Sequence, residues 1–168
     1  AENSGIQALT IHGRSRACKF TGQAEYDTIR HVKQRVNIPV IANGDITNAE
    51  KAKQVLNYTG ADAIMIGRAA QGKPWIFQEL YAALSGQQMS PLSLSEIKNV
   101  IQEHLDNLYS FYGAFSGVRI ARKHIGWYFE QLGPLPNEQK ILINQAEQPA
   151  QQLALVKASF NLITPRVA

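Results

Sequence analysis

The sequence predicts an α/β region followed by an all-α region. Three short apolar runs, at residues 8–11, 39–42 and 63–66, are separated by helix-length segments, and beyond residue 94 every strong periodic signal is helical. Repeated strand–helix units require a parallel sheet. Because three strands cannot close a barrel, we expect the last three β/α units of a (β/α)8 TIM barrel, followed by a small helical bundle.

The chain is expected to divide into three parts. Residues 1–86 would form the partial barrel domain, residues 87–94 a linker rich in Gly, Gln, Ser and Pro, and residues 95–168 the helical domain. The composition of the middle part is typical of a connection. The partial barrel would leave a sheet edge and apolar faces uncovered, which predicts poor solubility or self-association when it stands alone.

The three apolar runs are nearly continuous rather than alternating, which is typical of strands buried on both faces of a parallel sheet. Apolar spacing predicts helices at 24–36 and at 74–84. Between these two, Thr47 and Glu50 form a plausible capping box that opens a helix ending near Gly60. Four amphipathic helices are expected in the last part, around 97–108, 118–132 and 138–147 and from Pro149 onward.

Composition limits the possible partners and location. A formal net charge of +4 permits an anionic partner such as nucleic acid without demanding one. The single cysteine excludes an internal disulfide framework and fits a reducing compartment, so we expect a cytoplasmic protein. No apolar run is long enough to cross a membrane, and no metal site is predicted. The chain begins with Ala1 rather than Met, which agrees with a start inside a longer protein.

Two successive predicted strands end in glycine motifs. Asn43, Gly44 and Asp45 follow the second strand, and Gly67 and Arg68 follow the third. Glycine lets the backbone approach an anion, the next helix can direct N–H groups toward it, and an arginine offers a forked donor to phosphate oxygens. Either motif alone is also ordinary turn chemistry. Their occurrence on consecutive strands favours a phosphate site at the mouth of a barrel.

The first predicted strand ends in His12, with Arg14 and Arg16 close behind. An imidazole and a guanidinium at a barrel rim can polarise a carbonyl, hydrogen-bond a flavin ring or contact an RNA phosphate. The alternative is a structural histidine that caps the strand beside two solvated arginines. Cys18 lies in the same basic loop, but no partner for catalysis is evident, and we do not expect it to be catalytic.

One predicted helix carries a basic face. Arg119, Arg122 and Lys123 are expected to share it, roughly opposite His124, with Trp127 one turn beyond Lys123. This face is suited to an RNA phosphate backbone. A solvated basic face with no partner is the alternative reading of the same charges.

Taken together, these motifs resemble the tRNA-dihydrouridine synthase family, most closely its bacterial B-type members. The resemblance rests on H-G-R-S-R at 12–16, Gly22, P-V-I-A-N-G-D-I at 39–46, M-I-G-R-A-A at 65–70, P-W-I-F at 74–77 and V-R-I-A-R-K-H-I-G-W-Y at 118–128. It implies an FMN-dependent (β/α)8 barrel followed by a helical tRNA-binding domain. In such enzymes NADPH reduces the flavin, hydride passes to carbon 6 of a uracil flipped out of the tRNA, and a cysteine protonates carbon 5.

The resemblance implies roles for individual residues. The positions that match FMN-binding ones are Asn43, Gly44, Asp45, Gly67, Arg68 and His12. Arg14 matches a substrate contact, and Arg119, Arg122 and Lys123 remain the expected tRNA contacts.

The chain also departs from the family pattern. The proton-donor cysteine, a flavin-contacting lysine and the first FMN loop belong to earlier strands, and Cys18 does not match that cysteine. We therefore expect no catalytic residue in this chain, no synthase activity from it alone, and weak or no FMN binding. Two alternatives remain: another FMN-dependent TIM-barrel oxidoreductase acting on a small molecule, which would not need the basic helix, and a stand-alone RNA-binding helical module.

Overall fold

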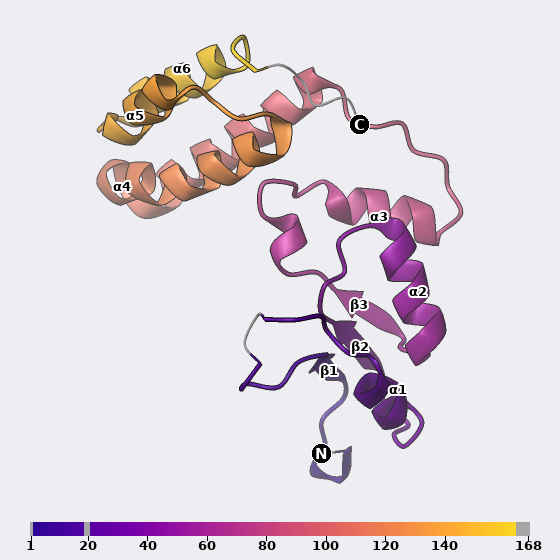
Figure 1. Cartoon of the computed structure of the whole chain (residues 1–168). Helices are drawn as coiled ribbons and strands as arrows, with labels where there is room; N and C mark the ends of the chain where they lie inside the picture. Colours follow the sequence, from indigo (N-terminus) through magenta and orange to yellow (C-terminus); the bar gives the residue numbers. More distant parts are fainter. Residues whose placement is uncertain (1, 19–20, 164–168) are drawn as a thin grey trace. The chain divides into compact units, whose positions relative to one another are not determined.

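The computed structural model describes residues 2–18 and 21–163 and contains two compact units (Figure 1). The first comprises Ala1–Ala70 and Pro74–Met89, and the second Gln71–Lys73 and Ser90–Ala168. The elements of the first unit are η1 (Glu2–Ser4), β1 (Leu9–His12), α1 (Asp27–Lys33), β2 (Val40–Asn43), α2 (Ala49–Thr59), β3 (Ala63–Met65), η2 (Arg68–Ala70) and α3 (Ile76–Leu84). Those of the second are α4 (Leu94–Leu132), α5 (Asn137–Gln145) and α6 (Pro149–Ser159).

The three strands form one parallel sheet in the order β1-β2-β3. Helix α2 contacts both β2 and β3, and it packs against α1 and α3. The helices alternate with the strands along the chain, because each apolar strand must be followed by a crossover before the next parallel strand can pair. The predicted parallel sheet with alternating helices is therefore confirmed.

The core of the first unit lies on one face of this sheet. Val40 and Ala42 of β2 are completely buried, in a cluster with Ile29 of α1, Val55 of α2 and Ile76 of α3. Side chains alternate along a strand, so residues 41 and 43 of β2 point to the other face.

That other face is exposed in the part of the chain that the structure describes. Thr10, Ala63 and Met65 are exposed there, and Met65 retains 46% of its accessible surface. Burial on both faces, which the apolar runs indicate, is not seen among the described residues, because α1, α2 and α3 cover only one face. The other is the uncovered sheet face expected of a partial barrel.

Helix α4 is a helical hairpin rather than one straight rod. Gly113 has φ 74° and ψ 167°, a left-handed conformation that glycine adopts without steric cost, and it separates two arms. The arms lie against each other, because the Nδ1 of His104 in the first arm is 2.8 Å from the hydroxyl oxygen of Tyr128 in the second. Figure 1 shows α4 doubling back on itself. The two helices predicted around 97–108 and 118–132 are these arms.

A buried glutamine joins α6 to α4 and α5. Gln152 is completely buried, and its Oε1 accepts a hydrogen bond from the Tyr109 hydroxyl at 2.8 Å. Its Nε2 donates to the carbonyl oxygens of Val118 at 3.1 Å and Ile143 at 3.2 Å. Burial raises the pKa of Tyr109 to about 12, so its hydroxyl stays protonated and donates near neutral pH.

Several predicted helix ends differ from the structure. The N-cap of α2 is Asn48, whose amide oxygen accepts from the Lys51 N–H, so the predicted capping box at Thr47 is wrong. Helix α3 begins at Ile76, two residues after the predicted start. Helix α4 begins at Leu94, inside the predicted linker, because Ser93 and Glu96 form a complete capping box there.

Candidate functional site

The carboxyl ends of the three strands meet at one edge of the sheet. His12 is in register with Asn43, and Asn43 with Met65. The Asn43 side chain donates from Nδ2 to the Met65 carbonyl at 2.8 Å, and the Gly13 N–H donates to the Asn43 carbonyl at 2.9 Å. Hydrogen bonds therefore connect the ends of adjacent strands at the edge where the sequence predicts a phosphate site.

A cavity of about 520 Å³ opens at this edge, within the range of small-molecule sites. All six predicted cofactor residues line it. Its lining is His12, Asn43, Gly44, Asp45, Ile46, Thr47, Met65, Gly67, Arg68 and Ala69. The structure thus brings together residues from three strand ends that are up to 57 positions apart in the sequence.

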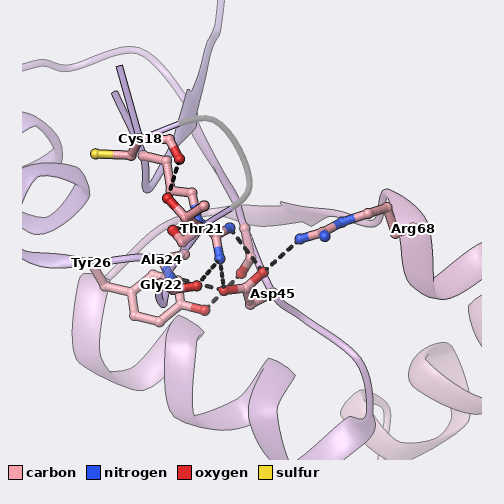
Figure 2. Close-up of polar contacts among 9 residues, drawn as sticks. Cys18, Thr21, Gly22, Ala24, Tyr26, Asp45 and Arg68 are labelled. Carbon is pink, nitrogen blue, oxygen red and sulfur yellow. Dashed lines mark hydrogen bonds and ion pairs between the residues drawn. The ribbon is translucent and has the colours of Figure 1, made fainter. Parts of the chain in front are cut away.

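Asp45 is the centre of the polar contacts at this site (Figure 2). Arg14 donates from Nη1 to Oδ1 at 2.9 Å and from Nη2 to Oδ2 at 2.6 Å, which makes a bidentate pair. The Ala24 N–H donates to Oδ2 at 2.8 Å, and Arg68 donates to Oδ1 at 3.1 Å. The Arg14 hydrogen bonds hold the pKa of Asp45 below its ordinary value, with help from the Ala24 N–H and the charge of Arg68, so Asp45 is ionised at neutral pH.

Arg14 is an internal anchor of its own loop. Its side chain is only 3% exposed. Besides Asp45 it donates to the carbonyls of Gly22 at 2.6 Å and Thr21 at 3.3 Å, so most of its N–H groups are used within the chain. Asp45 correspondingly raises the pKa of Arg14. The sequence alone could not show these internal contacts, and the substrate contact expected for Arg14 stays a prediction.

Gly44 leaves the cavity open and the turn unstrained. Its φ of 130° is a conformation that L side chains rarely adopt, and a Cβ there would lie 2.8 Å from the Ala24 Cβ and 3.4 Å from the His12 ring. Tyr26 fixes the same turn by donating its hydroxyl to the Gly44 carbonyl at 2.7 Å. This role of Tyr26 has no signal in the sequence, because a tyrosine near a helix start has no local signature.

Cys18 lies apart from the cavity. It is exposed, and its Sγ is 3.1 Å from the Ser15 Oγ. In Figure 2 its sulfur points away from Asp45. The placement supports leaving Cys18 without a catalytic role.

The three predicted basic residues of α4 differ in exposure. Arg119 and Lys123 are exposed, whereas Arg122 is partly buried and donates to the Ala146 carbonyl at 3.4 Å. Arg122 also lines a cavity of about 290 Å³ in the helical unit, and its buried Nε has no hydrogen-bond partner among the described residues. At 100° per residue the three positions fall within about 100° of one another around the α4 axis, as the sequence predicts, and they differ in burial rather than in face.

Other kinds of site find no support in residues 2–18 and 21–163. No group of three potential metal ligands occurs there. None of the helices in this part of the chain has the length and hydropathy needed to span a bilayer.

A parallel β/α unit with a glycine- and arginine-lined cavity at its strand ends, followed by a helical unit, defines a class of α/β proteins with a helical appendage. Within that class, this chain belongs to the dihydrouridine synthase (Dus) family, whose match covers residues 1–164. The resemblance seen in the sequence is thereby confirmed.

Individual relatives agree with this assignment. The chain is 56% identical over 162 residues to tRNA-dihydrouridine synthase B of Escherichia coli (strain K12) and 55% identical over 161 residues to that of Salmonella typhimurium. The corresponding protein of Yersinia pestis is 54% identical over 162 residues. Each match covers 95% of this chain but 50% of the relative, so the chain spans about half the length of the curated relatives it matches.

Proposed function

We propose that this chain supplies the phosphate end of an FMN site and the RNA-binding helical unit of a tRNA-dihydrouridine synthase. The observation that carries the proposal is the cavity in which all six predicted cofactor residues meet. The parallel β/α units with one uncovered sheet face fit the last three units of a (β/α)8 barrel, whose interior side would be that face. The match to the dihydrouridine synthase family supports reduction of tRNA uridines as the proposed reaction.

Asp45 and Arg68 line the cavity, and the cluster that they form with Arg14 carries an excess positive charge, which suits a phosphate. Arg14 and Arg68 together bring two positive charges to the single carboxylate of Asp45. Arg14 makes the stronger, bidentate pair and is buried, whereas the Arg68 side chain is 56% exposed. Arg68 can therefore turn toward a phosphate while Asp45 keeps Arg14 and the Ala24 N–H as partners. Gly67 has open space around it, so the backbone before Arg68 is accessible.

The remaining cavity residues would position the rest of the cofactor. His12 and Asn43 lie side by side on neighbouring strands, where they can contact the flavin or its ribityl chain. FMN, reduced by NADPH, would supply the hydride for reduction of the C5=C6 bond of specific tRNA uridines. We propose that the proton-donor cysteine of the family is contributed from outside this chain. The chain alone would then be inactive and bind FMN weakly or not at all.

The helical unit would grip the tRNA while the α/β unit receives the flipped base. Arg119 and Lys123 are exposed one helical turn apart, which suits contacts to successive phosphates. Arg122 is retained as a weaker candidate because of its partial burial. A protein with this function would act in the cytoplasm.

The small-molecule alternative is disfavoured by the family match and by the exposed basic residues of α4. The RNA-binding module is a second candidate, because the helical unit is compact and has its own buried core, including Ile101, Leu105 and Ile125. Salt-dependent tRNA binding with no flavin requirement would support that candidate.

The proposal is tested by measuring flavin and activity together. The 168-residue chain should show no dihydrouridine formation in tRNA and less than stoichiometric flavin after purification. The same chain joined to the remaining half of a family member should hold flavin and form dihydrouridine. Stoichiometric flavin on the chain alone would contradict the proposed division of the site.

A further inference from the structure

Three aromatic side chains are exposed at the tip of the α4 hairpin. Phe111, Tyr112 and Phe115 retain 78%, 47% and 68% of their accessible surface. Other aromatic residues of α4, such as Tyr128 and Phe129, are buried. Exposing several large aromatic residues within five positions is unfavourable in water and marks an interaction surface.

The turn at Gly113 creates this cluster. It places Phe111 and Tyr112 at the end of the first arm and Phe115 at the start of the second. The rings of Phe111 and Tyr112 are packed edge to face, with centroids 4.8 Å apart. The edge of one ring covers one face of the other, and the remaining faces of this exposed pair are available to a further planar group.

Cations continue the cluster along the second arm. The Arg119 guanidinium lies 3.9 Å from the centroid of the Phe115 ring. Lys123 follows one turn later, and its ammonium is 5.7 Å from the Trp127 ring. These four residues are spaced four positions apart, about 6 Å along a helix, and so form one row.

The charge of this region has one sign. Between Asp106 and Glu130 the sequence holds Arg119, Arg122 and Lys123 but no Asp or Glu. An apolar protein partner would desolvate Arg119 and Lys123 without offering a carboxylate in return, which is costly. A partner that combines planar π faces with negative charge meets both requirements.

We propose that Phe111, Tyr112, Phe115 and Arg119, here named the hairpin-tip platform, stack on unpaired bases of RNA. Lys123 and Arg119 then contact the adjoining phosphates. Base stacking on aromatic and guanidinium planes is the usual mode of single-strand recognition, and duplex RNA does not present its base faces. The proposal rests on the RNA-binding role proposed above and extends it to residues outside the basic set.

The test measures binding of labelled tRNA to the full 168-residue chain over a range of salt concentrations. Phe115→Ala should weaken binding about tenfold, as expected for loss of one base stack. Its salt dependence should stay that of the wild type, because stacking releases no counterions. Phe115→Trp should restore the affinity. Arg119→Gln should weaken binding and lower the salt slope by about one.

Phe77 provides the matched control. It is an exposed phenylalanine of the other unit, on α3, with 54% of its surface accessible. Phe77→Ala should leave tRNA binding unchanged, and circular dichroism should show all variants folded.

Wild-type affinity in Phe115→Ala would overturn the proposal while leaving the proposed function intact. Loss of self-association in that variant, at unchanged tRNA affinity, would instead identify the tip as a contact between two copies of the chain. A wild-type chain that fails to bind tRNA would overturn both the platform and the RNA-binding role.

Discussion

Replacing Gln152 should loosen the helical unit more than any surface change of similar size. Gln152 is completely buried, and its amide forms hydrogen bonds with Tyr109, Val118 and Ile143. Gln152→Leu removes the amide but keeps most of the volume. The packing is then nearly preserved, and the cost arises from the polar groups left behind.

Two of those groups lose their partner in the variant. The Tyr109 hydroxyl is buried, and the Ile143 carbonyl lies in the last turn of α5, where intrahelical partners are missing. The Val118 carbonyl lies inside the second arm of α4 and keeps its intrahelical bond. An unsatisfied buried polar group costs about 1–3 kcal/mol, so Gln152→Leu should cost about 3 kcal/mol.

A double-mutant cycle makes the estimate specific. Tyr109→Phe alone should cost about 1 kcal/mol. Tyr109→Phe removes the hydroxyl that Gln152→Leu would leave without a partner. The double variant should therefore cost about 2 kcal/mol, less than the sum of the two single variants. Urea unfolding is followed by Trp127 fluorescence in a Trp75→Phe background, since Trp75 belongs to the other unit. Gln151→Leu, an exposed neighbour, is the control and should change stability by less than about 0.5 kcal/mol.

Equal midpoints for Gln152→Leu and Gln151→Leu would refute the reasoning. Strict additivity of Gln152→Leu and Tyr109→Phe would also refute it, because the hydroxyl and the amide would then act independently.

Three further outcomes follow from close approaches and charges. Gly117→Ala should destabilise the hairpin by about 1–3 kcal/mol, because a Cβ there would lie 2.9 Å from the Tyr109 Cα. The control is Gly126→Ala, since a Cβ at Gly126 would meet open space. The midpoints of urea unfolding compare the two variants. Burial lowers the pKa of His104 and of the neighbouring His124, so the unfolded state binds their protons more readily. Stability of the helical unit should therefore be flat above about pH 6.5 and fall below it. His104→Gln should reduce this fall in thermal melts, and His124 should account for the part that remains. Arg14→Met should raise the pKa of Asp45 toward its ordinary value in an NMR titration, and an unchanged value would show that Arg14 does not set it.

Local patterns were sufficient to predict the strands and the cavity. Apolar runs placed β2 and β3 within one or two residues, and the two glycine motifs together with His12 placed six cavity residues at one sheet edge. Parallel pairing makes this possible, because it puts the carboxyl ends of all strands on the same side.

Long-range contacts were not accessible to the same reasoning. Nothing near Arg14 indicates that it pairs with Asp45, 31 positions away, rather than facing a ligand. The burial of Arg122 depends on where Ala146 lies. The exposure of Phe115 is equally hidden, since helical spacing alone would place an aromatic residue in the core.

We propose above that the cavity at the ends of β1, β2 and β3 holds the FMN phosphate through Arg68. Flavin content per protein tests it most directly, measured by absorbance on this chain joined to the remaining half of a family member. Arg68→Gln should lose most of the flavin, while Arg119→Gln, on the helical unit, should retain it in full. Full flavin content in Arg68→Gln would contradict the account.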